Sequence, residues 1–123
     1  VLPLKNSLEG LEAMLKVISE SGCGSFLVVL KRFGKQESKF SFPMEGYTLS
    51  LDFPVSIKAF KLMNKLDEIT IENGGRFYLA KDSRMSLQTL SASDKRSKEF
   101  SQFRASLNCT EKFSSIQSER LGL

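Results

Sequence analysis

The amino-acid sequence predicts an α+β domain in which helices pack on one face of an antiparallel sheet. Two stretches, residues 6–20 and 56–72, carry apolar residues at the three- and four-residue spacing of amphipathic helices. Between them, residues 26–30 are continuously apolar and residues 47–53 alternate strictly, and both patterns are typical of strands. A short apolar segment at residues 77–79 completes an αββαβ order, which suits one sheet with helices packed on it.

The first helix is expected to begin at Asn6, because Asn6 with Glu9 three residues later fits a capping box. Gly22 and Gly24 end it. The second helix is predicted to be capped by Ser56 and to end at 73–75, where two glycines allow a positive φ. Its buried stripe is expected to consist of Ile57, Phe60, Met63, Leu66 and Ile69.

The run at residues 26–30 is predicted to be a central strand covered on both faces. In the alternating run the apolar side chains face one way and the polar ones the other. The apolar set is Tyr47, Leu49, Leu51 and Phe53, and the polar set is Thr48, Ser50 and Asp52. Serine, threonine and aspartate are ordinary surface residues, so these residues alone favour a polar side that faces water.

The remainder is predicted to be helical. A short helix is expected from Ser83 or Ser86 through Leu90, and a basic helix from about Asp94 past Leu107. Residues 114–121 are expected to dock as a last helix, anchored by Ile116 and Leu121. Charge runs of the kind seen in the basic helix usually form a solvated face.

Composition sets further bounds. The 123 residues suit one domain with one core, and the net charge of +4 is dispersed, which argues against a nucleic-acid partner. The absence of histidine excludes Ser-His-Asp and Cys-His catalysis and histidine metal sites, and we expect no metal site. Cys23 and Cys109 fit no CxxC spacing, so free thiols are favoured over a disulfide. No run is long enough for a membrane helix. Because the chain begins at Val1, we expect a fragment of a longer polypeptide.

The stretch from Gly74 to Arg84 gathers charge at the end of an apolar segment. Lys81 follows that segment, where it could hold an anionic or electron-rich ligand or exchange protons. Asp82 and Arg84 could pair with each other or cap the following helix. The residues alone favour a surface or salt-bridged role for Lys81, since charged residues mark sites only probabilistically.

Three segments occur in an order that resembles a known family. They are Ser25–Gly34, with its Lys31-Arg32-Phe33-Gly34; the two Phe-Pro segments ending at Pro43 and Pro54; and Gly74–Arg84, with its Ala-Lys-Asp-Ser-Arg. Together they resemble the C-terminal part of FAD-linked oxidoreductases of the vanillyl-alcohol-oxidase superfamily. Within it the chain is most similar to the branch of the decaprenylphosphoryl-β-D-ribose 2-oxidases and D-arabinono-1,4-lactone oxidases, across nearly its whole length.

The resemblance implies a single domain over residues 1–123, part of a ferredoxin-like substrate-binding cap over the flavin, with the N-terminal FAD domain absent from this chain. It implies that Lys81 contacts both flavin and substrate as the catalytic residue. The substrate- or flavin-facing residues would be Tyr78, Lys31, Phe33, Thr48 and Ser50. The polar side of the alternating strand would then face the pocket. Thr48 and Ser50 stand where the resembled oxidase has Asn and Cys, and the end of the chain lacks the expected Asp-Pro.

The implied function is oxidation of an alcohol carbon of a sugar, sugar lactone or polyol, with FAD as the cofactor. The implied partners are a sugar-type substrate and the protein's own FAD domain, in a cytoplasmic protein with possible peripheral membrane association. The alternative is a stand-alone, non-catalytic α+β module that binds a ligand or another protein. A phosphate-cradling FAD domain upstream in the same reading frame would favour the enzyme.

Overall fold

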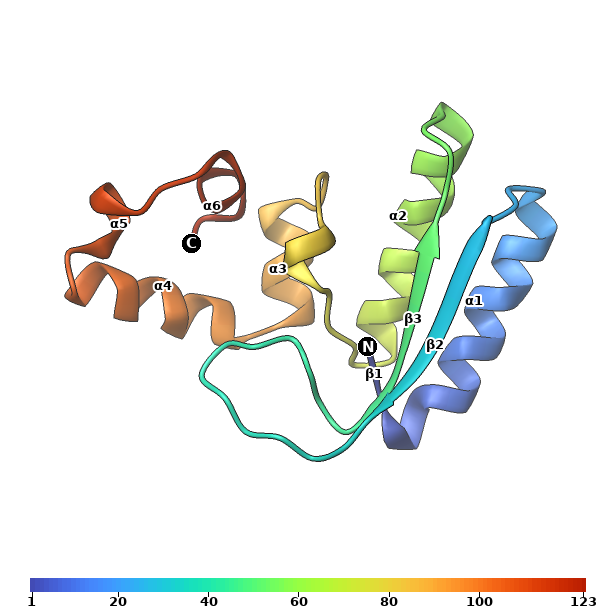
Figure 1. Ribbon diagram of the computed structural model, residues 1–123, viewed down its shortest axis with the longest axis horizontal. Coiled ribbons are helices and arrows are strands. Elements are labelled where there is room, and N and C mark those ends of the chain that lie inside the picture. Colours follow the sequence, from blue (N-terminus) through green and yellow to red (C-terminus); the bar gives the residue numbers. More distant parts are fainter.

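The computed structural model describes all 123 residues and has an α+β fold, a three-stranded antiparallel sheet with six α-helices (Figure 1). The α+β class and the antiparallel sheet are thereby confirmed. The strands are β1 Leu2–Pro3, β2 Leu27–Phe33 and β3 Gly46–Asp52. The helices are α1 Ser7–Ser21, α2 Ile57–Glu72, α3 Leu87–Ser93, α4 Arg96–Ser106, α5 Cys109–Lys112 and α6 Ile116–Leu121, with 3-10 turns η1 Leu4–Asn6 and η2 Leu79–Lys81.

Strand β3 is the centre of the sheet, whose order is β1-β3-β2. All seven residues of β2 pair with β3, from Leu27 opposite Asp52 to Phe33 opposite Gly46. On the other side β1 pairs only with Tyr47 and Gly46. The rest of β3 therefore has no strand on that side, which leaves one flank open toward α2.

The prediction that residues 26–30 form a covered central strand was wrong. Strand β2 lies at the edge of the sheet, and Phe26, Leu27, Val28 and Leu30 are each more than half exposed. The continuous apolar run correctly indicated a strand, but a run of this kind does not tell whether another element covers it.

Residues 77–79 do not form the predicted third strand. The backbone of Arg76 exchanges two hydrogen bonds with Val1, of 2.8 and 2.7 Å, and the chain then turns into η2. The third strand is instead β1. It has only two residues, one of which is Pro3, so its sequence shows no strand pattern. Gly46 allows β1 to approach, because a Cβ there would lie 1.9 Å from the carbonyl oxygen of Leu2.

Helices α1 and α2 pack against each other, and α1 also contacts β1 and β3. Gly22 ends α1 with a φ of 61°, and the Ser56 hydroxyl caps α2 through the Ala59 N–H, both as predicted. The capping box at Asn6 is not formed; the Asn6 side-chain nitrogen donates to the carbonyl of Asn73. This contact ties the start of α1 to the end of α2.

The predicted stripe of α2 was wrong at its first turn, since Ile57 and Phe60 are exposed. The buried face of α2 is instead Ala59, Leu62 and Thr70. The other three residues of the predicted stripe, Met63, Leu66 and Ile69, are partly buried.

The C-terminal helices form a group beside the sheet (Figure 1). They therefore do not belong to the predicted single layer of helices on one face of the sheet. Helices α3, α4 and α6 match the three predicted helices, whereas α5 was not predicted. Met85, Leu90 and Leu121 make the core of this group, while Ile116, a predicted anchor, is 86% exposed.

The chain exposes 8146 Å² of surface. A compact monomer of its mass, 13.8 kDa, would expose about 6,600 Å². Cys23 and Cys109 are free thiols. None of the helices combines the length and the apolar character needed to cross a bilayer.

Candidate functional site

A cavity of about 900 Å³ lies among strands β2 and β3, helix α2 and the segment 76–85. Its lining runs along β3 and continues to Phe53. Of its 35 lining residues, 21 are hydrophobic, so the walls suit a largely apolar or aromatic ligand. All six site residues predicted from the sequence line this cavity: Lys31, Phe33, Thr48, Ser50, Tyr78 and Lys81.

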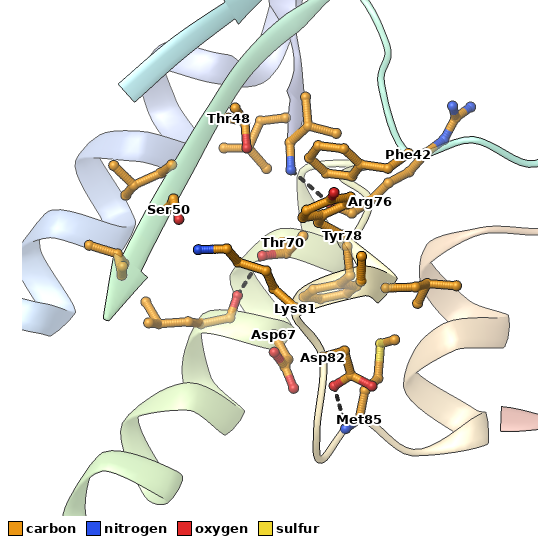
Figure 2. A pocket seen from close by; sticks show the side chains of 18 of the residues that line it. Phe42, Thr48, Ser50, Asp67, Thr70, Arg76, Tyr78, Lys81, Asp82 and Met85 are labelled. Atoms are coloured by element: carbon orange, nitrogen blue, oxygen red, sulfur yellow. Dashed lines mark hydrogen bonds between the residues drawn. The ribbon is translucent and has the colours of Figure 1, made fainter. Parts of the chain in front are cut away.

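Lys81 ends the turn η2, and its side chain extends across the cavity toward Ser50 on β3 (Figure 2). Thr70 lies beneath this side chain but donates its hydroxyl to the carbonyl of Leu66, 2.7 Å away. Lys81 is exposed, and its ammonium makes none of the hydrogen bonds or ion pairs found in the chain. A cation without a protein partner beside an apolar wall is available to an anionic or electron-rich ligand.

The polar side of β3 contributes hydroxyl groups to the cavity lining. Thr48 and Ser50 are both partly buried and line the cavity, and in the sheet register they stand opposite Lys31 and Val29 of β2. The solvent-facing side that these residues alone favour is therefore only partly exposed in this structure. Each hydroxyl can donate one hydrogen bond to a ligand and accept others.

An aromatic wall closes the side of the cavity near β1. The ring of Phe42 lies 5.1 Å from that of Tyr78 and 5.9 Å, edge to face, from that of Phe33. Phe42 belongs to the long loop that joins β2 to β3, which was not predicted to carry a site residue. The wall thus joins three segments that are distant in sequence.

Arg96 at the start of α4 holds that loop. Its guanidinium donates to the carbonyls of Ser41 at 3.0 Å and Ser38 at 3.3 Å. Phe40, between them, stacks on Phe100 of α4 with ring centroids 4.5 Å apart. These contacts set the path of the chain immediately before Phe42.

The Asp94 carboxylate accepts hydrogen bonds from the Arg96 guanidinium that holds this loop. Burial alone would raise the pKa of the Asp94 carboxyl, but the hydrogen bonds and charge of Arg96 outweigh it and hold the pKa below its usual value. The same hydrogen bonds raise the pKa of Arg96. Arg76 adds a second cation 3.8 Å from Asp94, and its charge lowers the pKa of that carboxyl further.

Arg84 ties segment 76–85 to α2. Its guanidinium donates to Asp67 at 2.9 Å and to Asn64 at 3.0 Å. Arg84 and Asp82 do not form the side-chain pair considered from the sequence; only the Arg84 backbone N–H contacts the Asp82 carboxylate. Burial raises the pKa of Asp67, and the charge of Arg84 partly opposes that shift.

Asp82 organises the turn after Lys81. Its carboxylate accepts hydrogen bonds from the N–H groups of Met85 and Arg84 and from the Arg120 guanidinium, at 2.8, 3.1 and 2.9 Å. Burial raises the pKa of Asp82, but these donors outweigh it and leave the pKa below its usual value. The sequence suggested a pair with Arg84 or a helix cap for Asp82, whereas the ion pair with Arg120, 38 residues away, was not expected.

Comparison with known proteins identifies homologues of this chain. Decaprenylphosphoryl-β-D-ribose oxidase of Mycolicibacterium smegmatis is 35% identical over 118 residues, which cover 95% of this chain and 26% of that protein. A Streptomyces coelicolor protein, named "uncharacterized protein in mprA 5′ region", is 34% identical over 115 residues, 92% of this chain and 31% of that protein. The chain is thus homologous to this oxidase and spans between a quarter and a third of the length of the two relatives. No family model matches the chain.

Proposed function

We propose that this chain is the substrate-binding, C-terminal part of an FAD-dependent oxidoreductase that oxidises an alcohol carbon of a sugar, sugar lactone or polyol. The observation that carries the proposal is the cavity, which gathers all six residues implied by the family resemblance in a chain homologous to an oxidase along 95% of its length. FAD, when bound, accepts the hydride that leaves the substrate carbon.

The residues that line the cavity fit the flavin ring of FAD. The mostly hydrophobic walls and the rings of Phe42 and Tyr78 suit a flat aromatic ligand. The unpartnered Lys81 ammonium would stabilise negative charge that develops during the reaction, or hold a substrate oxygen. Lys31, Thr48 and Ser50 would bind substrate oxygens from the sheet side and so orient the reacting carbon.

The order of elements supports a ferredoxin-like cap. The chain runs β1-α1-β2-β3-α2, and Arg76 then pairs with Val1 on the outer side of β1. This is the start of the split βαβ arrangement of that fold. The large exposed surface supports a role packed against a further domain, which we propose is the FAD domain.

The test uses the full-length protein. Decaprenylphosphoryl-β-D-ribose and D-arabinono-1,4-lactone are offered separately as substrates, and loss of oxidised-flavin absorbance is followed by stopped flow. Lys81→Ala should slow reduction about 100-fold, the usual effect of removing one charge-stabilising donor. Lys35→Ala, in the exposed loop after β2, is the matched control and should leave the rate unchanged.

If flavin reduction by Lys81→Ala is as fast as in the unchanged protein, Lys81 has no role in the site. A purified full-length protein that carries no flavin and does not reduce added flavin would overturn the proposal of an FAD-dependent enzyme. The alternative, a non-catalytic binding module, would then remain.

A further inference from the structure

The turn that carries Lys81 is closed by a side chain from the C-terminal helix. The amide nitrogen of Gln117 on α6 donates to the carbonyl of Leu79 at 2.6 Å and to that of Asp82 at 3.2 Å. These two carbonyls stand on either side of Ala80 and Lys81. One amide group therefore spans the turn and fixes the backbone from which Lys81 projects.

A second residue of α6 reinforces this contact. The Arg120 guanidinium lies 2.9 Å from the Asp82 carboxylate and also donates to the carbonyl of Met85. The two side chains are only 27% and 10% exposed, so this pair is better shielded from water than an ordinary surface pair. Gln117 thus bonds to the first residue of the segment from Leu79 to Met85, and Arg120 bonds to the last.

Helix α6 is itself well fixed although it has only six residues. Ser115 and Ser118 form a capping box at its start, and Leu121 is 1% exposed in the core with Met85 and Leu90. A helix of this length is unstable alone, so packing and capping hold it in place.

We propose that Gln117 and Arg120 are positioning residues for Lys81. Neither lines the cavity. Lys81 is exposed and no hydrogen bond or ion pair holds its ammonium, so the backbone that Gln117 and Arg120 fix sets the point from which its side chain reaches the cavity. A displacement of about 1 Å at a reacting group is enough to slow a reaction about 100-fold. The effect on activity rests on the proposed function, whereas the effect on the position of Lys81 does not.

The experiment measures both effects in the full-length protein. Lysines are reductively methylated with ¹³C, and the Lys81 resonance is assigned by its loss in Lys81→Arg. Gln117→Leu and the isosteric Gln117→Glu, which both lack the amide donor, should shift or broaden this resonance. Ile116→Ala, at an exposed position one residue away on the same helix, should not.

In activity assays the two Gln117 variants should lower kcat about tenfold or more with KM within about twofold, because the turn and not the binding surface has changed. Arg120→Lys, which keeps the charge opposite Asp82, should lower kcat less than Arg120→Leu. Thermal unfolding identifies any variant that fails to fold; if Gln117→Leu does so, Gln117→Glu and the Arg120 pair carry the test.

An unchanged Lys81 resonance in folded Gln117 variants would overturn the positioning role. A displaced resonance in a protein that carries no flavin and reduces none would support the positioning role while contradicting the proposed function.

Discussion

Arg96 grips the Asp94 carboxylate with two nitrogens, Nε at 2.9 Å from Oδ1 and Nη2 at 2.6 Å from Oδ2. This two-point contact orients the guanidinium so that its remaining hydrogens meet the carbonyls of Ser38 and Ser41. Two residues of the α3–α4 junction thereby determine the path of a loop more than fifty residues earlier in the chain.

Loss of Arg96 should free that loop. In Arg96→Ala, trypsin should cleave after Lys35 and Lys39 about tenfold faster or more, because charge-assisted hydrogen bonds of about 1.5–3 kcal/mol are lost. Mass spectrometry of timed digests measures the rate. Lys98→Ala, an exposed residue on the same helix, is the control, and equal cleavage in both variants would show that Arg96 does not hold the loop.

Gly46→Ala should separate β1 from β3. The new Cβ would meet the Leu2 carbonyl oxygen at 1.9 Å, so backbone must move, and the free energy of unfolding should fall by about 1–3 kcal/mol or more. Gly24→Ala is the matched control, because no atom lies within 4 Å of its Cβ. Urea unfolding compares the two, and equal midpoints would contradict the close contact.

The stability of the chain should fall in acid, partly through Asp82. Its pKa is lower in the folded than in the unfolded state, where it is about 3.9. Its stabilising contribution is therefore complete above that value and is lost as the pH falls through the lower, folded pKa. Asp82→Asn should be about 1–3 kcal/mol less stable at pH 7, since the ion pair with Arg120 is gone.

The measurement is urea unfolding of both proteins from pH 7 to pH 2. The difference between them should shrink as the pH falls below about 4. A difference that is the same at every pH would mean that the Asp82 charge plays no part.

The open edge of β2 should make the isolated chain associate. Its free backbone groups and its exposed Leu27, Val28 and Leu30 form a template for pairing with another strand. Val28→Lys should reduce association, followed by light scattering against concentration. Leu8→Lys removes an apolar side chain that is 73% exposed on α1, where there is no free edge. An equal effect of both substitutions would point to general hydrophobic contact instead.

Local patterns predicted those elements whose signals are local. Ser56, Ser86 and Gly22 mark helix ends that the structure reproduces, and alternation placed Thr48 and Ser50 on one face. The edge position of β2 and the pairing of β1 depend on which segments meet in space. A two-residue strand containing Pro3 carries no periodicity by which it could have been found.

The site divides in the same way. The family resemblance singled out six residues, and the fold brings them to one cavity. The residues that hold the cavity in shape were missed, because Arg96, Gln117 and Arg120 contact segments 35 to 58 residues away. No single sequence indicates which carbonyl a distant arginine or glutamine will meet.

The large exposed surface has a thermodynamic consequence. A chain that keeps 8146 Å² in water when folded gains less new contact with solvent when it unfolds. Both the heat-capacity change of unfolding and the denaturant m-value scale with that gain. Both should be smaller for this chain than for a compact domain of 123 residues, so its stability should change only gradually with temperature and its urea transition should be broad.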